Sequence, residues 1–151
     1  MRGMARLADP LDGFDHDHAS LSDALESLVA ARRAGAEGPD LVEHAERLRD
    51  EFLDHFGDEE EHLFPELAKL VPSAAPELDE LQKAHDTLCG LAVRIAVATE
   101  TSPTQIDALL ERLDAAYRQH ARREIEVLRG NLGKLSPEQR AGLLERLRSS
   151  S

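Results

Sequence analysis

The chain has 151 residues, of which 41% are hydrophobic and 32% charged, a composition typical of one folded domain rather than of a disordered chain. Its formal net charge of -12 excludes nucleic acid and anionic membrane surfaces as expected partners, because both would repel it. One cysteine, no apolar leader and no apolar run near the roughly 20 residues that span a bilayer predict a cytoplasmic protein without a membrane partner.

Apolar residues recur every three or four positions along most of the chain, which predicts helices and no strands. The first helix is expected over about residues 12–34, and the glycine-containing segment 35–40 ends it. The second helix is expected from Leu41, with Pro65 kinking or loosening its last turn because proline lacks the backbone N–H.

Two further long helices and a short one follow. After the proline-containing segment 71–76, an apolar row predicts a third helix over about residues 78–95. The sequence Ser-Pro-Thr-Gln at 102–105 predicts a serine-capped start for the fourth helix, which Gly130 is expected to end. A second Ser-Pro-x-Gln sequence predicts a short fifth helix over about residues 137–148.

Short connections force neighbouring helices to run antiparallel. The sequence therefore predicts an all-α fold, an up-down-up-down antiparallel four-helix bundle with a short C-terminal fifth helix. We expect one domain over residues 1–151, with the core bundle at about residues 12–130.

Every long predicted helix has one histidine on its apolar stripe: His18, His55, His85 and His120. In two helices a glutamate follows four residues later, at Glu59 and Glu124, which places both side chains on one face, a turn apart. His18 lies about 16 residues before the first turn and His55 about 16 after it, so the two share a level. The other marked residues fall within roughly one or two helical turns of that level.

Buried carboxylates without a partner are costly, so Glu59 and Glu124 require compensation. Two divalent cations would provide it, with the glutamates bridging the ions and the histidines binding from either side. Nitrogen and oxygen ligands fit iron or manganese better, and zinc remains open. The alternative is a metal-free network in which the histidines and glutamates satisfy one another.

These residues resemble the hemerythrin family, specifically the bacterial hemerythrin-like HHE cation-binding domains. The resemblance rests on His18, on HFGDEEEHLFP at residues 55–65, on KAHDTL at 83–88 and on HARRE at 120–124, and it covers residues 12–130. It implies a non-haem di-iron centre, oxo- or hydroxo-bridged, that binds dioxygen, nitric oxide or peroxide. The redox partner is unknown. Two alternatives remain: a di-iron enzyme that decomposes peroxide or reduces nitric oxide, and a protein that stores or senses zinc or another cation.

The chain departs from oxygen-carrying hemerythrins in the third and fourth helices. Those proteins have a second histidine one turn from the third-helix ligand, where this chain has Leu81 and Cys89. The HARRE spacing is also shorter than in oxygen carriers and ends in glutamate rather than aspartate. His62, about one turn beyond Glu59, is either a substitute ligand or a bystander beside Pro65.

Other residues near this level have open roles. Tyr117 is expected on the inward face, where it either buries its ring or directs its hydroxyl to a metal or a metal-bound oxygen species. Cys89 is expected to fill space in the core, with a soft ligand or redox-sensing thiol as the alternative. His16 and His44 are expected at the surface. The acidic run at 58–61 is expected to be solvated except for Glu59.

A ferritin-like site is the structural rival, because EEEH at residues 59–62 matches its Glu-x-x-His element. That fold requires the element twice. The fourth helix has Val127 where the second histidine would stand, so the ferritin-like alternative ranks below the hemerythrin-like one.

Overall fold

The computed structural model describes the backbone of residues 10–149 and the side chains of residues 18–149. Over this part of the chain the elements are helical and none is a strand. The long helices are α1 (Pro10–Arg33), α2 (Gly38–Asp58), α4 (Ala75–Thr101) and α5 (Ile106–Leu132). No helix between residues 10 and 149 combines the length and apolar character that a membrane crossing requires.

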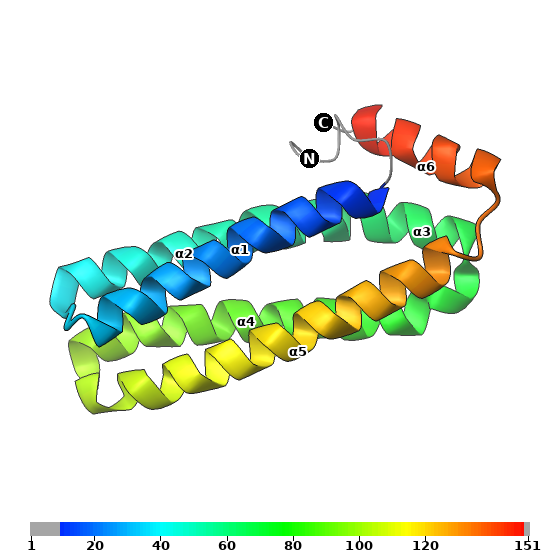
Figure 1. Cartoon of the computed structure of the whole chain (residues 1–151). Helices are drawn as coiled ribbons and strands as arrows, with labels where there is room; N and C mark the ends of the chain where they lie inside the picture. The colour runs from blue at the N-terminus through cyan, green and yellow to red at the C-terminus, as the bar shows by residue number, and fades with distance from the viewer. Residues whose placement is uncertain (1–9, 150–151) are drawn as a thin grey trace.

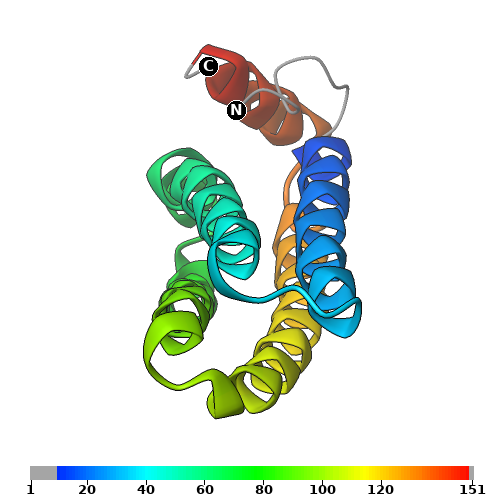
Figure 2. The same cartoon turned by 90° about the vertical axis from the view of Figure 1, so that its left-hand side faces the viewer.

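The long helices lie side by side and alternate in direction (Figure 1). Helix α1 packs against α2 and α5, and α4 packs against the same two helices. Figure 2 shows this arrangement from one end of the bundle. The predicted all-α antiparallel bundle is confirmed.

The turn between α1 and α2 has a defined hydrogen-bonding pattern. The backbone N–H of Ala36 donates to the carbonyl of Ala31 at 2.9 Å, and that of Gly35 donates to Arg32 at 3.0 Å. This pair of bonds is a Schellman motif, which requires a left-handed residue, and Gly35 has φ 94°. Helix α2 begins at Gly38, three residues before the predicted start.

The two Ser-Pro-x-Gln sequences adopt different structures. At residues 136–139 the backbone N–H of Gln139 donates to Ser136 Oγ at 3.1 Å, and the N–H of Ser136 donates to Gln139 Oε1 at 2.9 Å. This is the reciprocal capping box expected before α6 (Pro137–Ser149). The prediction of a capping serine at Ser102 is wrong: its side chain makes no cap, and a 3₁₀ turn, η4 (Pro103–Gln105), precedes α5 instead.

The predicted end of the fourth helix at Gly130 is also wrong, because α5 continues to Leu132. Asn131 is buried there, and its amide donates to the carbonyl of Val127 at 2.8 Å and to Glu77 Oε1 at 3.2 Å. These bonds satisfy the buried amide within the helix, so Asn131 does not terminate it.

A π-helical segment, η2 (Glu59–Leu63), joins α2 to α3 (Phe64–Leu70). The N–H of Phe64 bonds to the carbonyl of Glu59, five residues earlier, directly before Pro65. The predicted loosening of the helix near Pro65 is confirmed. The wider turn shifts the following side chains around the axis, so Leu63 and Leu67 are buried and His62 is only half-buried.

Two apolar clusters fill the bundle on either side of a polar layer. One contains Phe52, Phe56, Leu88 and Tyr117, and the other contains residues such as Leu63, Leu81 and Val127. Glu59, His85, His120 and Glu124 fall between these clusters along their helices, His18 borders the first cluster, and His55 lies between two residues of the first cluster, Phe52 and Phe56. Each buried leucine contributes about 1.5–3 kcal/mol of transfer free energy, so the two apolar clusters stabilise the layer that they enclose.

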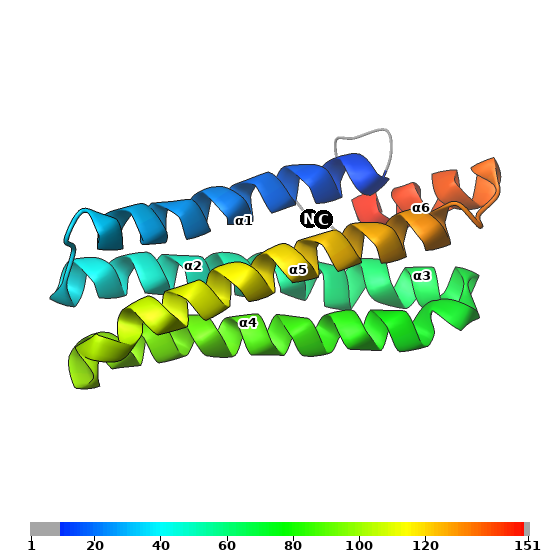
Figure 3. The same ribbon diagram turned by 60° about the horizontal axis from the view of Figure 1, so that its bottom comes forward.

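Helix α6 crosses the end of the bundle where α3 lies (Figure 3). It contacts α1 and α3, and its Leu143 and Leu147 belong to the second apolar cluster. Arg146 Nε donates to Glu66 Oε2 at 2.6 Å across the α6–α3 contact. The fifth helix therefore covers one end of the core.

Candidate metal centre

Four helical segments contribute polar side chains to the layer between the apolar clusters. His18 comes from α1, Glu59 from the first position of η2, His85 from α4, and His120 and Glu124 from α5. All five are buried. Imidazoles and carboxylates rarely occur together in such a setting unless they have partners or a ligand.

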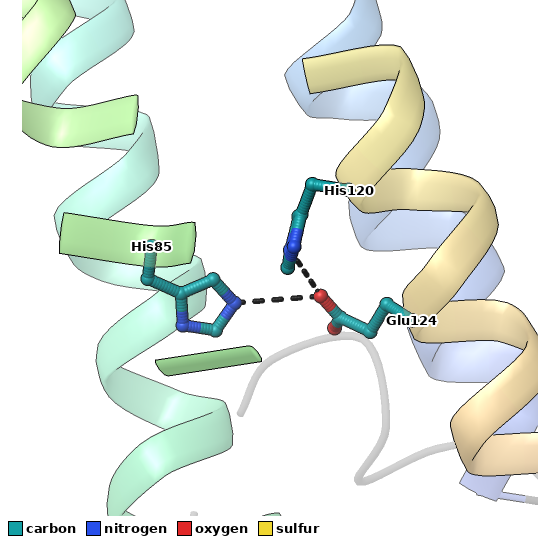
Figure 4. A group of neighbouring side chains, drawn as sticks. All are labelled: His85, His120 and Glu124. Atoms are coloured by element: carbon teal, nitrogen blue, oxygen red, sulfur yellow. Dashed lines mark hydrogen bonds and ion pairs between the residues drawn. The ribbon is translucent and has the colours of Figure 1, made fainter. Parts of the chain in front are cut away.

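Glu124 lies at the centre of this group and has no exposed surface. Its Oε2 is 3.4 Å from Nε2 of His85 and also contacts Nε2 of His120, as Figure 4 shows. Its other oxygen, Oε1, is 3.8 Å from Nε2 of His18. The two oxygens of one carboxylate therefore face different sets of ligand-type residues.

The ligand atoms form two groups, each with its members within 4.8 Å of one another. One group is His85, His120 and Glu124, and the other is His18, Glu59 and Glu124. Glu124 belongs to both groups, so its carboxylate is shared by two candidate cation sites. The donors are nitrogen and oxygen atoms only, a set that suits iron, manganese or zinc.

Several polar atoms in the layer are buried without a hydrogen bond. Among the described residues, none provides a hydrogen-bond partner for Nδ1 of His120 or for Oε1 of Glu124. The distances from Glu124 to His85 and His18 and the 4.0 Å from His85 Nε2 to Glu59 Oε2 lie at or beyond the limit of a hydrogen bond. Apart from the close contact between His120 and Glu124, these separations are too long for a self-satisfied polar network, so the donor set fits cations better than the metal-free alternative.

The environment determines the charge of Glu124. Burial would raise the pKa of its carboxyl, but interactions with Glu59 and the three surrounding histidines outweigh burial and hold that pKa well below its usual range. The side chain is therefore a carboxylate at neutral pH, which is the form that binds a cation.

Aromatic rings line the layer and restrict the imidazoles. The ring of His85 stacks on Phe56, with centroids 3.8 Å apart and planes within 4°. Phe56 also contacts the ring of His120 edge-on at 5.7 Å, and Phe64 lies 5.9 Å from His85. These contacts fix the ring planes and keep water from that side of the site.

His55 is buried one turn before Glu59, but its ligand atoms belong to neither group. Its Nε2 is 3.0 Å from Oε2 of Glu51, which lies one turn earlier on α2. Sequence reasoning had not singled out Glu51, although its spacing of four residues from His55 was visible. A metal-binding role for His55 stays a prediction, and it requires the imidazole to turn away from Glu51.

His62 is half-buried and also lies outside both groups. The π-helical turn carries it off the line of Glu59, so its role as a substitute ligand stays a prediction. Neither residue at the positions of the missing third-helix histidine is a nitrogen ligand. Leu81 is buried, and Cys89 is half-buried against the first apolar cluster. Burial, followed by the nearby carboxylates of Asp86 and Glu60, raises the pKa of the Cys89 thiol to about 11.

Tyr117 packs its ring against Phe52 and His18. Its hydroxyl donates to the backbone carbonyl of His18 at 3.2 Å and lies 3.4 Å from Ser22 Oγ. Burial raises the pKa of this phenol to about 12, despite the opposing hydrogen bond with Ser22. Tyr117 therefore ties α5 to α1 beside His18, and its hydroxyl proton is already used.

Sequence reasoning missed Glu60, which had been expected in solvent with its neighbours. The structure places it half-buried, with Oε2 3.7 Å from Nδ1 of His85. The only signal was Pro65, because a helix that widens before a proline redirects the residues upstream. Of the two other histidines, His44 is half-buried, and the side chain of His16 lies outside the described residues.

Comparisons with known proteins agree with this geometry. Neither the curated proteins nor the solved structures compared with the chain gave a match. A family model described as the hemerythrin HHE cation binding domain matches residues 9–131, which include every residue of the two groups. The chain therefore belongs to the hemerythrin HHE cation-binding family.

Proposed function

We propose that the chain is a non-haem di-iron protein that binds dioxygen, nitric oxide or a related small oxidant inside the helical bundle. The observation that carries the proposal is the buried pair of three-residue groups that share Glu124. Family membership supports cation binding, and the nitrogen and oxygen donors favour iron over a thiolate-type zinc site.

Each residue has a role in this proposal. His85 and His120 hold one ion, His18 and Glu59 hold the other, and Glu124 joins the two. His55 is the residue we expect to complete the second site after it releases Glu51. Three side chains at the first site and four at the second would leave coordination positions open, and the chemistry supplied there would be binding or reduction of a small oxidant.

A groove between α4 and α5 offers a route to the site. It has a volume of about 240 Å³ and is lined by His120, Ala84, Ala116 and Arg123 among others. A groove of this size beside the buried His120 side chain admits a diatomic molecule or peroxide and excludes a large substrate.

Tyr117 bears on the choice between a binding protein and an enzyme. Its hydroxyl bonds to the carbonyl of His18, so it is not positioned to supply a proton to a bound oxidant. We therefore favour ligand binding over turnover of peroxide or nitric oxide. A cytoplasmic location remains part of the proposal and rests on the single cysteine.

The test is anaerobic loading with Fe(II), followed by metal analysis and mixing with dioxygen, nitric oxide or peroxide. We expect two irons per chain and a persistent visible-absorbing adduct. Rapid consumption of the oxidant without a persistent adduct would favour the enzyme. The proposal would be contradicted if the protein is purified with bound zinc and iron cannot replace that zinc.

A further inference from the structure

His85 has carboxylates near both of its ring nitrogens. Nε2 lies 3.4 Å from Glu124 Oε2, inside the site, whereas Nδ1 points away from it and lies 3.7 Å from Glu60 Oε2. The side chain of His85 is only 1% exposed, and its Nδ1 has no hydrogen-bond partner among residues 18–149. A buried ring nitrogen of this kind requires an acceptor or a donor close by.

Glu60 is held in place by the helix that carries His85. Its Oε1 accepts a hydrogen bond from Nε2 of Gln82 at 3.1 Å, and Gln82 lies three residues before His85 on α4. Glu59 and Glu60 are consecutive residues of η2, yet their carboxylates approach opposite nitrogens of one imidazole. The π-helical turn thus supplies one carboxylate to the site and a second carboxylate behind it.

The imidazole ring has little freedom to find another acceptor. Phe56 stacks on it in a nearly parallel plane, and Phe64 lies on the same ring at 5.9 Å. A small change in the side-chain torsions of Glu60 is enough to shorten its 3.7 Å distance from His85 Nδ1 to hydrogen-bond length. To reach any other acceptor, the His85 ring would have to give up its stacking on Phe56.

We propose that Glu60 is a positioning residue that fixes the tautomer of His85, with the proton on Nδ1 toward Glu60 and the lone pair of Nε2 toward the site. Histidines that bind metals usually donate their other N–H to a carboxylate, carbonyl or water, which orients the ring and raises its basicity. This role serves metal binding and so rests on the proposed function. The tautomer of His85 itself can be measured without any metal.

A purely electrostatic role is the alternative, in which Glu60 adds negative charge near a cation site. Glu61 provides a matched control, because it is the next residue, carries the same charge and is exposed. Four variants separate the two roles: Glu60→Gln, Glu60→Ala, Glu61→Gln and Glu61→Ala. An electrostatic role gives equal effects for glutamine and alanine at each position, because both substitutions remove the same charge. A positioning role gives effects at Glu60 only, and they are larger for alanine, which offers no acceptor.

The first measurement is ¹⁵N NMR of the His85 imidazole in the metal-free protein at one pH. Because Glu124 faces Nε2 and Glu60 faces Nδ1, the two carboxylates compete for the imidazole proton; we expect more protonation at Nδ1 in the wild type than in Glu60→Ala, where the proton moves toward Nε2, with Glu61→Ala unchanged. The second is the affinity for Zn²⁺, a diamagnetic probe, by competition with a chelator. We expect Glu60→Ala to bind one of two ions about 10–100-fold more weakly, Glu60→Gln to lie between, and the Glu61 variants to match the wild type.

The outcomes keep this inference separate from the proposed function. If the tautomer responds to Glu60 but no variant or wild type binds a metal, the positioning role stands and the proposed function fails. If the wild type binds two ions while both Glu60 variants match their Glu61 counterparts, the positioning role is overturned and the proposed function stands. Thermal unfolding of each metal-free variant checks that the bundle is folded.

Discussion

Replacing Glu124 by glutamine removes the charge of the central side chain while keeping its volume. Glu124 is a member of both ligand groups, whereas Glu59 and His85 are each members of one. Glu124→Gln should therefore weaken the binding of both ions by at least about a hundredfold. Glu59→Gln and His85→Ala should each leave about one ion per chain, because one three-residue group stays intact.

The size of the effect follows from the loss of a direct ligand. Even changes behind the ligands cost about 10–100-fold in metal affinity, so a hundredfold loss, about 2.7 kcal/mol, is a lower limit. A metal present at 1,000 times its Kd stabilises the fold by about 4.1 kcal/mol, and a hundredfold weaker Kd reduces this to about 1.4 kcal/mol. For a chain of this size, the metal-induced rise in Tm should fall by about 5–11 °C for each of the two ions.

Equilibrium dialysis with Fe(II) under anaerobic conditions measures the stoichiometry, and calorimetry with and without metal measures the shift in Tm. Glu126→Gln is the matched control, because Glu126 lies on the same helix, is exposed and pairs only at the surface with Arg123. The reasoning is refuted if Glu124→Gln still binds two ions with the wild-type rise in Tm.

Three further predictions concern groups outside the ligand set. Burial raises the pKa of the Cys89 thiol from 9.0 to about 11, so its thiolate fraction at pH 8 should be about a hundredfold smaller than that of an ordinary thiol. The rate of its reaction with a disulfide reagent should therefore keep rising up to pH 11. A plateau of that rate near pH 9 would contradict this prediction. Tyr117 is the only tyrosine and there is no tryptophan, so tyrosinate absorbance should appear near pH 12 in the folded protein. Its pKa is raised above the unfolded value of 10, so the stability it contributes is present below pH 10 and is lost as the pH rises toward 12; ionisation at pH 10 without unfolding would be inconsistent with its burial. Ser136→Ala should lower the free energy of unfolding by about 1 kcal/mol in urea, whereas Ser102→Ala should have no measurable effect, and equal losses would show that both serines cap.

The architecture could be predicted because it depends on patterns that are visible in the sequence alone. Helical periodicity identifies the long helices, and short turns fix their antiparallel order. Counting residues from those turns placed His18, His85 and His120 near one level, and the structure brings them together around Glu124. Spacing of four residues was sufficient to place Glu124 beside His120.

The parts that sequence reasoning missed depend on local geometry. One π-helical turn redirects Glu60 toward His85 and moves His62 off the line of Glu59, and periodicity assumes that no such turn exists. His55 is buried, but its imidazole bonds to Glu51, a choice of rotamer that residue spacing does not determine. The same Ser-Pro-x-Gln pattern forms a cap before α6 and a 3₁₀ turn before α5, because the backbone conformation decides which bonds form.

The most direct test of the central claim is a crystal structure of the iron-loaded protein with anomalous scattering recorded at the iron edge. The account predicts two anomalous peaks in the polar layer, about 3.5–4 Å apart, with one oxygen of Glu124 directed at each. A single peak, or two peaks that do not share Glu124, would contradict it.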